Sequence, residues 1–179
     1  MKKKVAIDIG HAYQTGSAGN GLQEHERCAR IAEALRERLE QMGFEVGVVD
    51  FPTQTNTADL VATARAINAG GYDLSVSLHC DHSDNALAKG AHVIYVSKKG
   101  EVAAGYIAKH LCALMPGRAN RIVKNAGLYV LNNTRCAAVL CECGFVSNRE
   151  DAKLLTSERG IVSIARAIAV GVREYFNLN

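Results

Sequence analysis

The sequence predicts a single α/β domain in which a twisted, mainly parallel β-sheet is flanked by helices on both faces. Short apolar runs typical of buried strands alternate with longer stretches whose apolar residues recur at helical spacing. The 179 residues are 48% hydrophobic and 22% charged, which is the composition of one ordinary globular domain. There are only two prolines and no Ser/Gly-rich or charged tract that would mark a linker. We therefore expect residues 1–179 to form one domain.

The first half of the chain predicts two strands, each followed by a helix. Residues 5–9 form an apolar strand that leads into a glycine-rich loop at 10–21. Residues 24–42 carry apolar side chains at helical spacing, and Gly43 suits the position just past a helix end. A strand at 44–49 follows. Asn56 or Thr57 can cap the next helix, which ends at Gly70-Gly71.

The second half continues the alternation. Strands are predicted at 74–78 and 91–96, and a helix at 102–114 that stops before Pro116. Two further apolar runs, 128–131 and 138–142, are also predicted to be strands. A last amphipathic helix covers 161–175. We find no internal repeat.

Composition excludes several other classes of protein. A disordered chain would have fewer hydrophobic residues or a larger net charge, and no heptad or Gly-X-Y period indicates a coiled coil or collagen. A formal net charge of +3 is too modest for a dedicated nucleic-acid surface, so we expect no nucleic-acid partner. No apolar stretch reaches the roughly 18 residues of a membrane span. Lysines at 2–4 precede only a short run that contains an aspartate, so we expect no signal peptide.

The six cysteines are expected to be free, buried thiols. They include no C-x-x-C pair, and each lies among apolar residues. A disulfide between Cys141 and Cys143 would join neighbours on one face of a strand, where the geometry is poor. Without an export signal the reduced state is the default. The cysteines are Cys28, Cys80, Cys112, Cys136, Cys141 and Cys143.

Polar side chains stand at the ends of three predicted strands. His11 follows the first strand, His79 follows the strand at 74–78, and Glu142 ends the strand at 138–142. In an open α/β sheet, ligands bind outside the carboxyl ends of the strands, so parallel neighbours would bring these side chains to one edge. Glu24 opens the helix after the first strand and is expected at the same edge.

Two imidazoles and one carboxylate form a ligand set that zinc accepts, with a fourth position left for water or substrate. Such a metal lowers the pKa of water and polarises a carbonyl, and a second carboxylate can move the proton to a leaving amine. His11, Glu24 and His79 fit the ligands, and Glu142 fits the acid/base. Each has a structural alternative as well, and Glu26 competes with Glu24 as ligand. A lone carboxylate among apolar neighbours, such as Glu142, is the hardest to explain by packing.

Four segments, taken in order, carry a resemblance. They are Gly10-His11, residues 21–24 (GLQE), residues 77–79 (SLH) and residues 139–148 (VLCECGFVSN). With the closing segment 151–155 (DAKLL), they resemble the zinc-dependent N-acetylmuramoyl-L-alanine amidases of the Amidase_3 type over nearly the whole chain. The 139–148 block is the most specific, because a Gly-His or Ser-x-His alone is a weak signal.

The resemblance implies an activity and a role for each residue. Enzymes of this family cut the amide bond between N-acetylmuramic acid and L-alanine of the peptidoglycan stem peptide. By resemblance, His11, Glu24 and His79 hold zinc, and Glu142 is the catalytic residue. The fold implied is again a mainly parallel sheet flanked by helices. The partner implied is peptidoglycan, and we expect a monomer.

The sequence departs from the family pattern after both histidines. Residues 12–18 (AYQTGSA) stand where the family usually has glycines and an Asp-Pro-Gly-Ala run, and Cys80-Asp81 stands where Ala-Asn is frequent. These departures concern substrate contacts near the metal more than the metal itself. The segment 81–90 leaves no room for the regulatory helix that blocks the site in some members. We therefore predict a constitutively open site.

Other polar features have structural explanations. The loop at 10–21 lies between a strand and a helix as phosphate loops do, but it matches neither GxGxxG nor GxxxxGK[ST], which favours a flexible loop over the site. Cys80 is expected to point to the face of its strand opposite His79. Basic residues form a solvated face or attract anionic wall polymers; they are Arg118, Arg121 and Lys124. Surface or packing roles are expected for His25, His82, His92 and His110.

Three alternative functions are left open. The same residues would serve a metal amidase acting on soluble muropeptides. A non-catalytic wall-binding module would have no need of Glu142. A flavodoxin-like nucleotide-binding protein is disfavoured by its glycine spacing and would show no zinc dependence. We expect synthesis in the cytoplasm and action on the cell wall after release, as for a phage endolysin; a catalytic domain of a secreted autolysin is the alternative.

Overall fold

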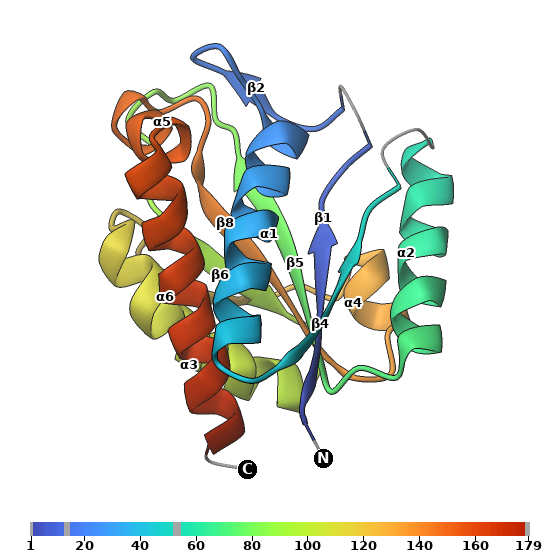
Figure 1. Cartoon of the computed structure of the whole chain (residues 1–179). Helices are drawn as coiled ribbons and strands as arrows, with labels where there is room; N and C mark the ends of the chain where they lie inside the picture. The colour runs from blue at the N-terminus through green and yellow to red at the C-terminus, as the bar shows by residue number, and fades with distance from the viewer. Residues whose placement is uncertain (1, 13–14, 52–54, 178–179) are drawn as a thin grey trace.

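Strands and helices alternate along most of the chain (Figure 1). The structure is a computed structural model that describes residues 2–12, 15–51 and 55–177. Its strands are β1 (Lys4–Ile9), β2 (Ala18–Gly19), β3 (Leu22–Gln23), β4 (Glu45–Val49), β5 (Leu74–Asp81), β6 (His92–Tyr95), β7 (Ile122–Lys124) and β8 (Ala137–Phe145). Its helices are α1 (Glu24–Gln41), α2 (Asn56–Gly70), α3 (Lys98–Leu114), α4 (Tyr129–Asn133), α5 (Arg149–Thr156) and α6 (Glu158–Asn177).

Six strands form one sheet in the order β4-β1-β5-β8-β6-β7, and β2 and β3 form a separate hairpin. Neighbours from β4 to β8 pair in parallel, as do β6 and β7, whereas β6 and β8 pair antiparallel. This confirms the predicted α/β fold with a mainly parallel sheet. The carboxyl ends of β1, β5 and β8 therefore meet at one edge of the sheet, at the top of Figure 1.

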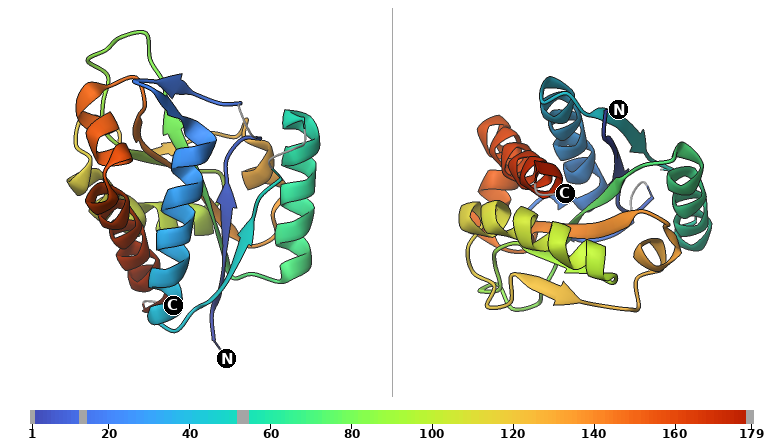
Figure 2. Two further views of the ribbon diagram at one scale, coloured as in Figure 1. Left: turned by 45° about the horizontal axis from the view of Figure 1, so that its top comes forward. Right: turned by 90° about the horizontal axis from the view of Figure 1, so that it is seen from below.

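Helices cover both faces of the sheet, as predicted, but unequally (Figure 2). Helices α1, α3 and α6 pack on one face, where they bury one large apolar cluster that includes Leu35, Ile107 and Ile168. Helices α2 and α4 lie on the other face. Two small clusters are buried there, one that includes Ile67 and one that includes Leu140.

Residues 128–131 are not a strand, and that prediction is wrong. The helix α4 begins at Tyr129. The amides of Asn132 and Asn133 donate hydrogen bonds to the carbonyls of Leu128 and Tyr129, at 2.9 and 2.8 Å, which ties this short helix to itself. A four-residue apolar run cannot distinguish a strand from a short buried helix. Strand β7, helix α5 and the β2–β3 hairpin are not predicted from the sequence, because each is short.

The ends of several elements differ from prediction. Thr55, rather than Asn56 or Thr57, caps α2: its hydroxyl accepts a hydrogen bond from the backbone N–H of Ala58 at 3.5 Å. Strand β5 continues to Asp81 and β8 to Phe145. His79 and Glu142 consequently lie inside strands, which fixes their side chains more firmly than a loop would.

Part of the predicted glycine-rich loop is a β-hairpin. Its turn places Asn20 and Gly21 at φ 49° and 75°, the left-handed region that a two-residue hairpin turn uses. The side-chain amide of Asn20 donates to the carbonyl of Val146 at 2.8 Å, which ties the hairpin to the end of β8. Residues 13–14 of the predicted loop lie outside the described residues.

All six cysteines are free, and all but Cys136 are buried. Cys80 belongs to the apolar cluster on the α1 side of the sheet, as predicted from strand alternation. Within the described ranges, no helix is long and apolar enough to cross a membrane.

Candidate active site

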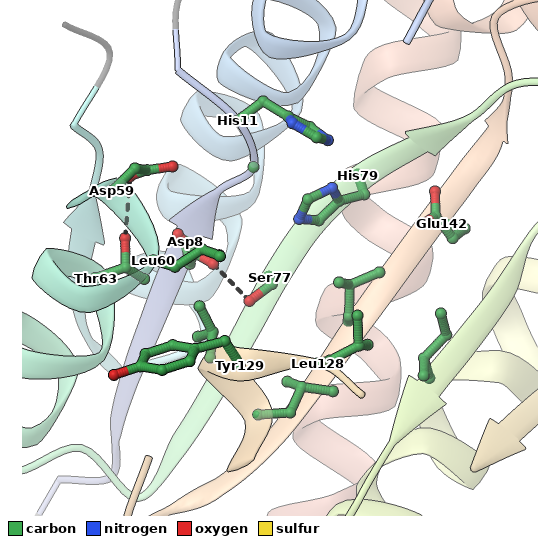
Figure 3. A pocket seen from close by; sticks show the side chains of 15 residues that line it. Asp8, His11, Asp59, Leu60, Thr63, Ser77, His79, Leu128, Tyr129 and Glu142 are labelled. Atoms are coloured by element: carbon green, nitrogen blue, oxygen red, sulfur yellow. Dashed lines mark hydrogen bonds between the residues drawn. The ribbon is translucent and has the colours of Figure 1, made fainter. Parts of the chain in front are cut away.

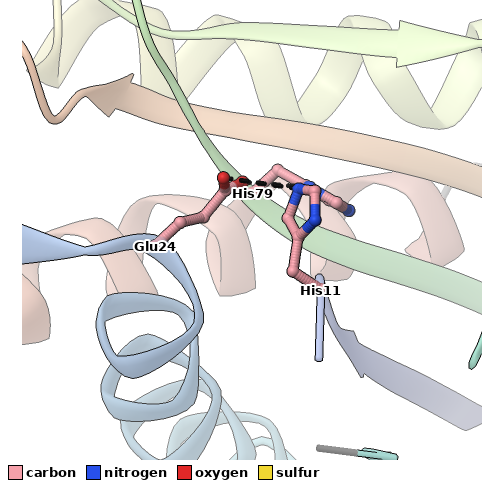
Figure 4. Close-up of side chains that lie close together, drawn as sticks. All are labelled: His11, Glu24 and His79. Atoms are coloured by element: carbon pink, nitrogen blue, oxygen red, sulfur yellow. Dashed lines mark hydrogen bonds and ion pairs between the residues drawn. The ribbon is translucent and has the colours of Figure 1, made fainter. Parts of the chain in front are cut away.

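Three side chains from separate elements meet at the carboxyl edge of the sheet (Figure 4). His11 follows β1, Glu24 begins α1, and His79 lies near the end of β5. Glu24 Oε2 is 3.3 Å from His11 Nε2, and Glu24 Oε1 is 3.1 Å from His79 Nδ1. One donor atom from each residue lies within 4.8 Å of the others. The structure thus brings together the three residues that the sequence analysis selects as ligands.

Main-chain groups hold the Glu24 carboxylate in place. The N–H of Ser17 donates to Oε2 at 2.6 Å, and the N–H of Cys80 donates to Oε1 at 2.9 Å. Burial by itself raises the pKa of Glu24, but the hydrogen bonds from His79 and from these N–H groups outweigh it and hold the pKa at about 2. Glu24 is therefore an ionised carboxylate at neutral pH. Glu26, the competing candidate, is exposed and lies outside this cluster.

The two imidazoles titrate differently. Burial lowers the pKa of His11 below its usual 6.5, although Glu24 opposes the change. Burial also acts to lower the pKa of His79, but the hydrogen bond to Glu24 and the charge of Glu142 raise it overall. The rings meet edge to face with centroids 5.0 Å apart. Both side chains are accessible, at 31% for His11 and 18% for His79.

Glycine at two positions allows this close approach. A Cβ at Gly10 would lie 2.4 Å from the His79 ring. A Cβ at Gly16 would lie 2.7 Å from both Glu24 and the His11 ring, and Gly16 has φ 85°. His11 itself has φ 64°, which is uncommon for a residue other than glycine and is a feature of functional sites. The local backbone is thus shaped to present the cluster.

Glu142 lies beside His79 on the neighbouring strand. The two residues are partners in the parallel β5–β8 ladder, so their side chains share one face of the sheet. Glu142 Oε2 is buried, and no hydrogen-bond partner for it exists among the described residues. Burial raises the pKa of Glu142 to about 8, against the opposing charge of His79. A buried carboxyl oxygen without a hydrogen-bond partner is costly, and such groups are found at functional sites.

The donor set fits a divalent metal of the zinc type. Two imidazole nitrogens and one carboxylate oxygen are common ligands of catalytic zinc sites, which keep a further position open. The carboxylate is ionised and both rings are accessible, as ligation requires. Across the ranges that the structure covers, this is the only group of three or more His, Cys, Asp or Glu side chains close enough to hold one ion.

The other histidines lie near carboxylates outside the cluster. Their shortest contacts to carboxylates are 3.0 Å from His25 to Asp50, 3.0 Å from His110 to Glu174, 3.4 Å from His92 to Asp81 and 3.6 Å from His82 to Asp84. None of them joins the cluster of His11, Glu24 and His79.

Sequence reasoning misses a buried polar pair below the cluster. The Ser77 hydroxyl donates to the Asp8 carboxyl at 2.6 Å. Burial raises the pKa of Asp8 to about 6, although Ser77 and His79 oppose the change. The sequence does contain a signal for this pair, because Asp8 and Ser77 are polar residues within otherwise apolar strands. Both lie on the face of the sheet that does not carry the large apolar cluster.

The fold and the cluster together define a class: an α/β protein with a histidine–carboxylate centre at the carboxyl edge of a mainly parallel sheet. Residues 5–174 match the N-acetylmuramoyl-L-alanine amidase family, Amidase_3. The chain belongs to this family. The match includes all four residues of the candidate site and confirms the resemblance seen in the 139–148 block.

Relatives and solved structures agree with this assignment. The chain is 32% identical to the N-acetylmuramoyl-L-alanine amidase CwlM of Bacillus licheniformis, over 98% of this chain and 70% of the relative. It is 31% identical to the endolysin of Bacillus phage SPP1, over 99% of this chain and 68% of the relative. The catalytic domain of the CD27L endolysin targeting Clostridia difficile superposes with a TM-score of 0.87 at 29% identity, covering 96% of this chain and 97% of that one.

The CwlD amidase of Clostridioides difficile, solved in complex with the GerS lipoprotein, superposes with a TM-score of 0.89. The match covers 99% of this chain and 100% of that chain, at 22% identity. At that identity the likeness concerns the fold, which is shared along the whole length.

Proposed function

We propose that this chain is a zinc-dependent hydrolase that cleaves the amide bond between N-acetylmuramic acid and L-alanine in peptidoglycan. The observation that supports it most is the Glu142 carboxyl, whose buried Oε2 has no hydrogen-bond partner among the described residues, one strand away from the cluster of His11, Glu24 and His79. A cluster without an adjacent acid/base would suit a structural metal, and a lone carboxyl would have no electrophile to serve. Membership of the N-acetylmuramoyl-L-alanine amidase family supports the choice of the bond that is cleaved.

In the proposed mechanism His11, Glu24 and His79 would hold the zinc. When bound, the ion would acidify water and polarise the amide carbonyl. Glu142 takes a proton from the attacking water and then delivers it to the nitrogen of the departing L-alanine. The Ser17 and Cys80 N–H groups keep Glu24 ionised and oriented throughout.

The environment of Glu142 suits both proton transfers. Burial raises its pKa to about 8, so the protonated form is available to a leaving amine near neutral pH. A positive charge at the neighbouring cluster would favour the ionised form that accepts the first proton. The two states are therefore close in free energy, as an acid/base catalyst requires.

The proposal extends to the setting of the reaction. We propose that residues 1–179 act as one catalytic domain and a monomer, that the site is open without an activating partner, and that the protein acts on the cell wall after release from the cytoplasm. The β5–β6 connection at 82–91 contains no helix, which supports the open site.

The test is a digest of purified peptidoglycan that scores new L-alanine amino termini against new reducing sugar ends. We expect chelator-sensitive release of amino termini, restored by zinc, without reducing ends. His79→Ala is expected to lose bound zinc and activity together, whereas His110→Gln, a histidine paired with Glu174 away from the site, keeps both. Amine release that survives metal removal would contradict the zinc proposal.

Two results would point to the alternatives. Hydrolysis of soluble muropeptides with no release from intact wall would favour the metal amidase of soluble substrates. Binding to wall with no hydrolysis of either substrate would favour the non-catalytic module.

A further inference from the structure

The α2 side of the sheet contains a pocket that opens onto the candidate active site (Figure 3). Its volume is about 370 Å³, and His11, His79 and Glu142 form one end of it. Leu60 on α2 and Tyr129 on α4 both line it, and both are partly exposed, at 39% and 42%. The pocket exists because the short helix α4 and the helix α2 leave part of this sheet face uncovered.

The walls of this pocket are mostly apolar. Leucine, isoleucine, valine and tyrosine side chains from α2, the α4 segment, β6 and β8 line it; they are Leu60, Leu128, Tyr129, Leu131, Ile94 and Leu140, with Val130 beside them. The polar groups deeper in the pocket are already engaged. Ser77 donates to Asp8 at 2.6 Å, and Thr63 donates to Asp59 at 3.4 Å. A ligand that fills this space would therefore offer methyl groups and few unmet hydrogen-bond donors or acceptors.

The charge of the deep part of the pocket disfavours an anion. Asp8 and Asp59 contribute carboxyl groups, and none of the fifteen described lining residues is a lysine or arginine. A carboxylate placed deep in the pocket, away from the two histidines, would lose its hydration and meet the like charges of Asp8 and Asp59.

A cation stands elsewhere at the same sheet edge. The Arg118 guanidinium lies 5.4 Å from the centre of the Phe145 ring, at the end of β8. Arg118 is exposed and precedes β7, which is the outermost strand on the side of the sheet far from β4 and β1. It therefore lies away from α2. Within the described ranges it forms no salt bridge or side-chain hydrogen bond, which leaves the guanidinium free for an anionic group.

The two sides of the scissile bond differ in charge, as the pocket and the surface around Arg118 do. Beyond its first alanine, the stem peptide carries carboxylate groups. The N-acetylmuramoyl unit, once its lactyl carboxyl is in amide linkage, carries no charge and offers acetamido and lactyl methyl groups close to the bond. This comparison rests on the proposed substrate.

We infer that the pocket between α2 and α4 is the subsite for the uncharged N-acetylmuramoyl side of the substrate, and that the acidic peptide extends toward Arg118. Leu60 and Tyr129 are then specificity-determining residues. The pocket is continuous with the reacting groups, so it must receive a part of the substrate that is covalently close to the scissile bond. Its size exceeds one alanine methyl, and its charge rejects the acidic residues that follow.

The direct test is an NMR titration of isotope-labelled, zinc-loaded Glu142→Gln protein. The two probes are N-acetylmuramoyl-L-alanine methylamide and the tripeptide L-alanyl-γ-D-glutamyl-L-lysine. The muramoyl probe is expected to shift the backbone resonances of Leu60 and Tyr129, and the tripeptide is expected to leave them in place. Shifts there with the tripeptide, or none with the muramoyl probe, would overturn the inference.

A kinetic test uses variants of Leu60 and Tyr129. Because both side chains are partly exposed, their replacement by alanine is expected to leave the fold intact. Leu60→Ala and Tyr129→Ala are each expected to raise KM for a muramoyl peptide roughly 3–10-fold with kcat little changed, the pattern of lost ground-state binding. Val102→Ala is the matched control, since Val102 is 43% exposed on α3, on the other face. An unchanged KM in both pocket variants would contradict the subsite.

The outcomes separate this inference from the proposed function. If wild-type protein releases no L-alanine termini from any muramoyl peptide, the proposed function itself fails. If it releases them while the muramoyl probe shifts only resonances near Arg118, the function stands and the orientation of the substrate is reversed.

Discussion

On the α1 side of the sheet, Leu35 and Ile107 retain no exposed surface, whereas on the α2 side Leu60 and Tyr129 retain 39% and 42% of theirs. Both sides belong to the same sheet and are lined by the same kinds of residue. The first side is closed by three long helices that pack on one another as well as on the strands. The second is covered by α2 and the five-residue α4.

This difference separates stability from binding. The large cluster on the α1 side supplies most of the buried apolar area, and close packing there tolerates little change. The incompletely covered side holds the pocket, and pockets are sites of ligand binding. The candidate site joins the two, because Glu24 is anchored on α1 while His79 and Glu142 face the pocket.

The largest expected effect is on the pocket side, and it is an effect on rate. Glu142→Gln removes the proton acceptor and donor while preserving shape, so we expect kcat to fall about 10²–10⁴-fold. Zinc content and the free energy of unfolding of the zinc-loaded protein are expected to stay close to wild type. Steady-state kinetics and metal analysis of the same preparation check this. Near-wild-type turnover would remove Glu142 from the mechanism.

On the packed side, the matching effect is on stability. Leu35→Ala creates a cavity in a fully buried site, and we expect it to lower the free energy of unfolding by about 2–5 kcal/mol. Well below the unfolding transition, KM and kcat are expected to be unchanged, because Leu35 is one of the cluster residues and does not line the pocket. Urea unfolding and kinetics on one preparation give both numbers, and a loss of activity without a loss of stability would contradict the division.

The sequence predicts the packed side better than the pocket side. Helical spacing in 24–42 and 161–175 identifies α1 and α6 because a long buried stripe repeats many times. The pocket side depends on short elements. Residues 128–131 carry too few positions to reveal that α4 is a helix, and β7 has three residues. The pocket itself results from what these short elements leave uncovered, which no local pattern encodes.

The candidate site was predictable for a different reason. His11, His79 and Glu142 follow or end separate strands, and parallel pairing alone brings such positions to one edge. The backbone contacts that hold Glu24 were not predictable. They depend on the turn at Gly16 and on the N–H of Cys80, which are fixed only when the chain has folded.

A pH-dependent effect comes next in size and belongs to the metal-free protein. The pKa of Glu142 is about 8 in the folded state against a usual 4.5. Below pH 4.5 the carboxyl is protonated in both states. Between 4.5 and 8 the unfolded chain releases the proton and the folded chain keeps it, so the wild type loses stability as pH rises. Glu142→Gln has no such proton to keep.

We therefore expect Glu142→Gln to be more stable than wild type in the presence of a chelator, by on the order of 4 kcal/mol at pH 8. The advantage should shrink toward zero as pH falls to 4.5. Urea unfolding of both proteins at pH 5, 6.5 and 8 measures the difference between their free energies of unfolding. The contributions of the other titrating groups are common to both proteins and cancel in this difference. A difference that does not grow with pH would show that the Glu142 carboxyl is not held in its neutral form.

The smallest expected effect makes the comparison sharpest, because it repeats the leucine-to-alanine change on the pocket side. Leu60 is 39% exposed on α2, and alanine has the higher helix propensity, so Leu60→Ala should change the free energy of unfolding by no more than about 0.5 kcal/mol. Leu35→Ala, measured in the same urea series, is the reference. A loss of 2 kcal/mol or so at Leu60 would mean that the pocket wall is part of the stabilising core, and that the two faces differ in the amount of packing rather than in what the packing is for.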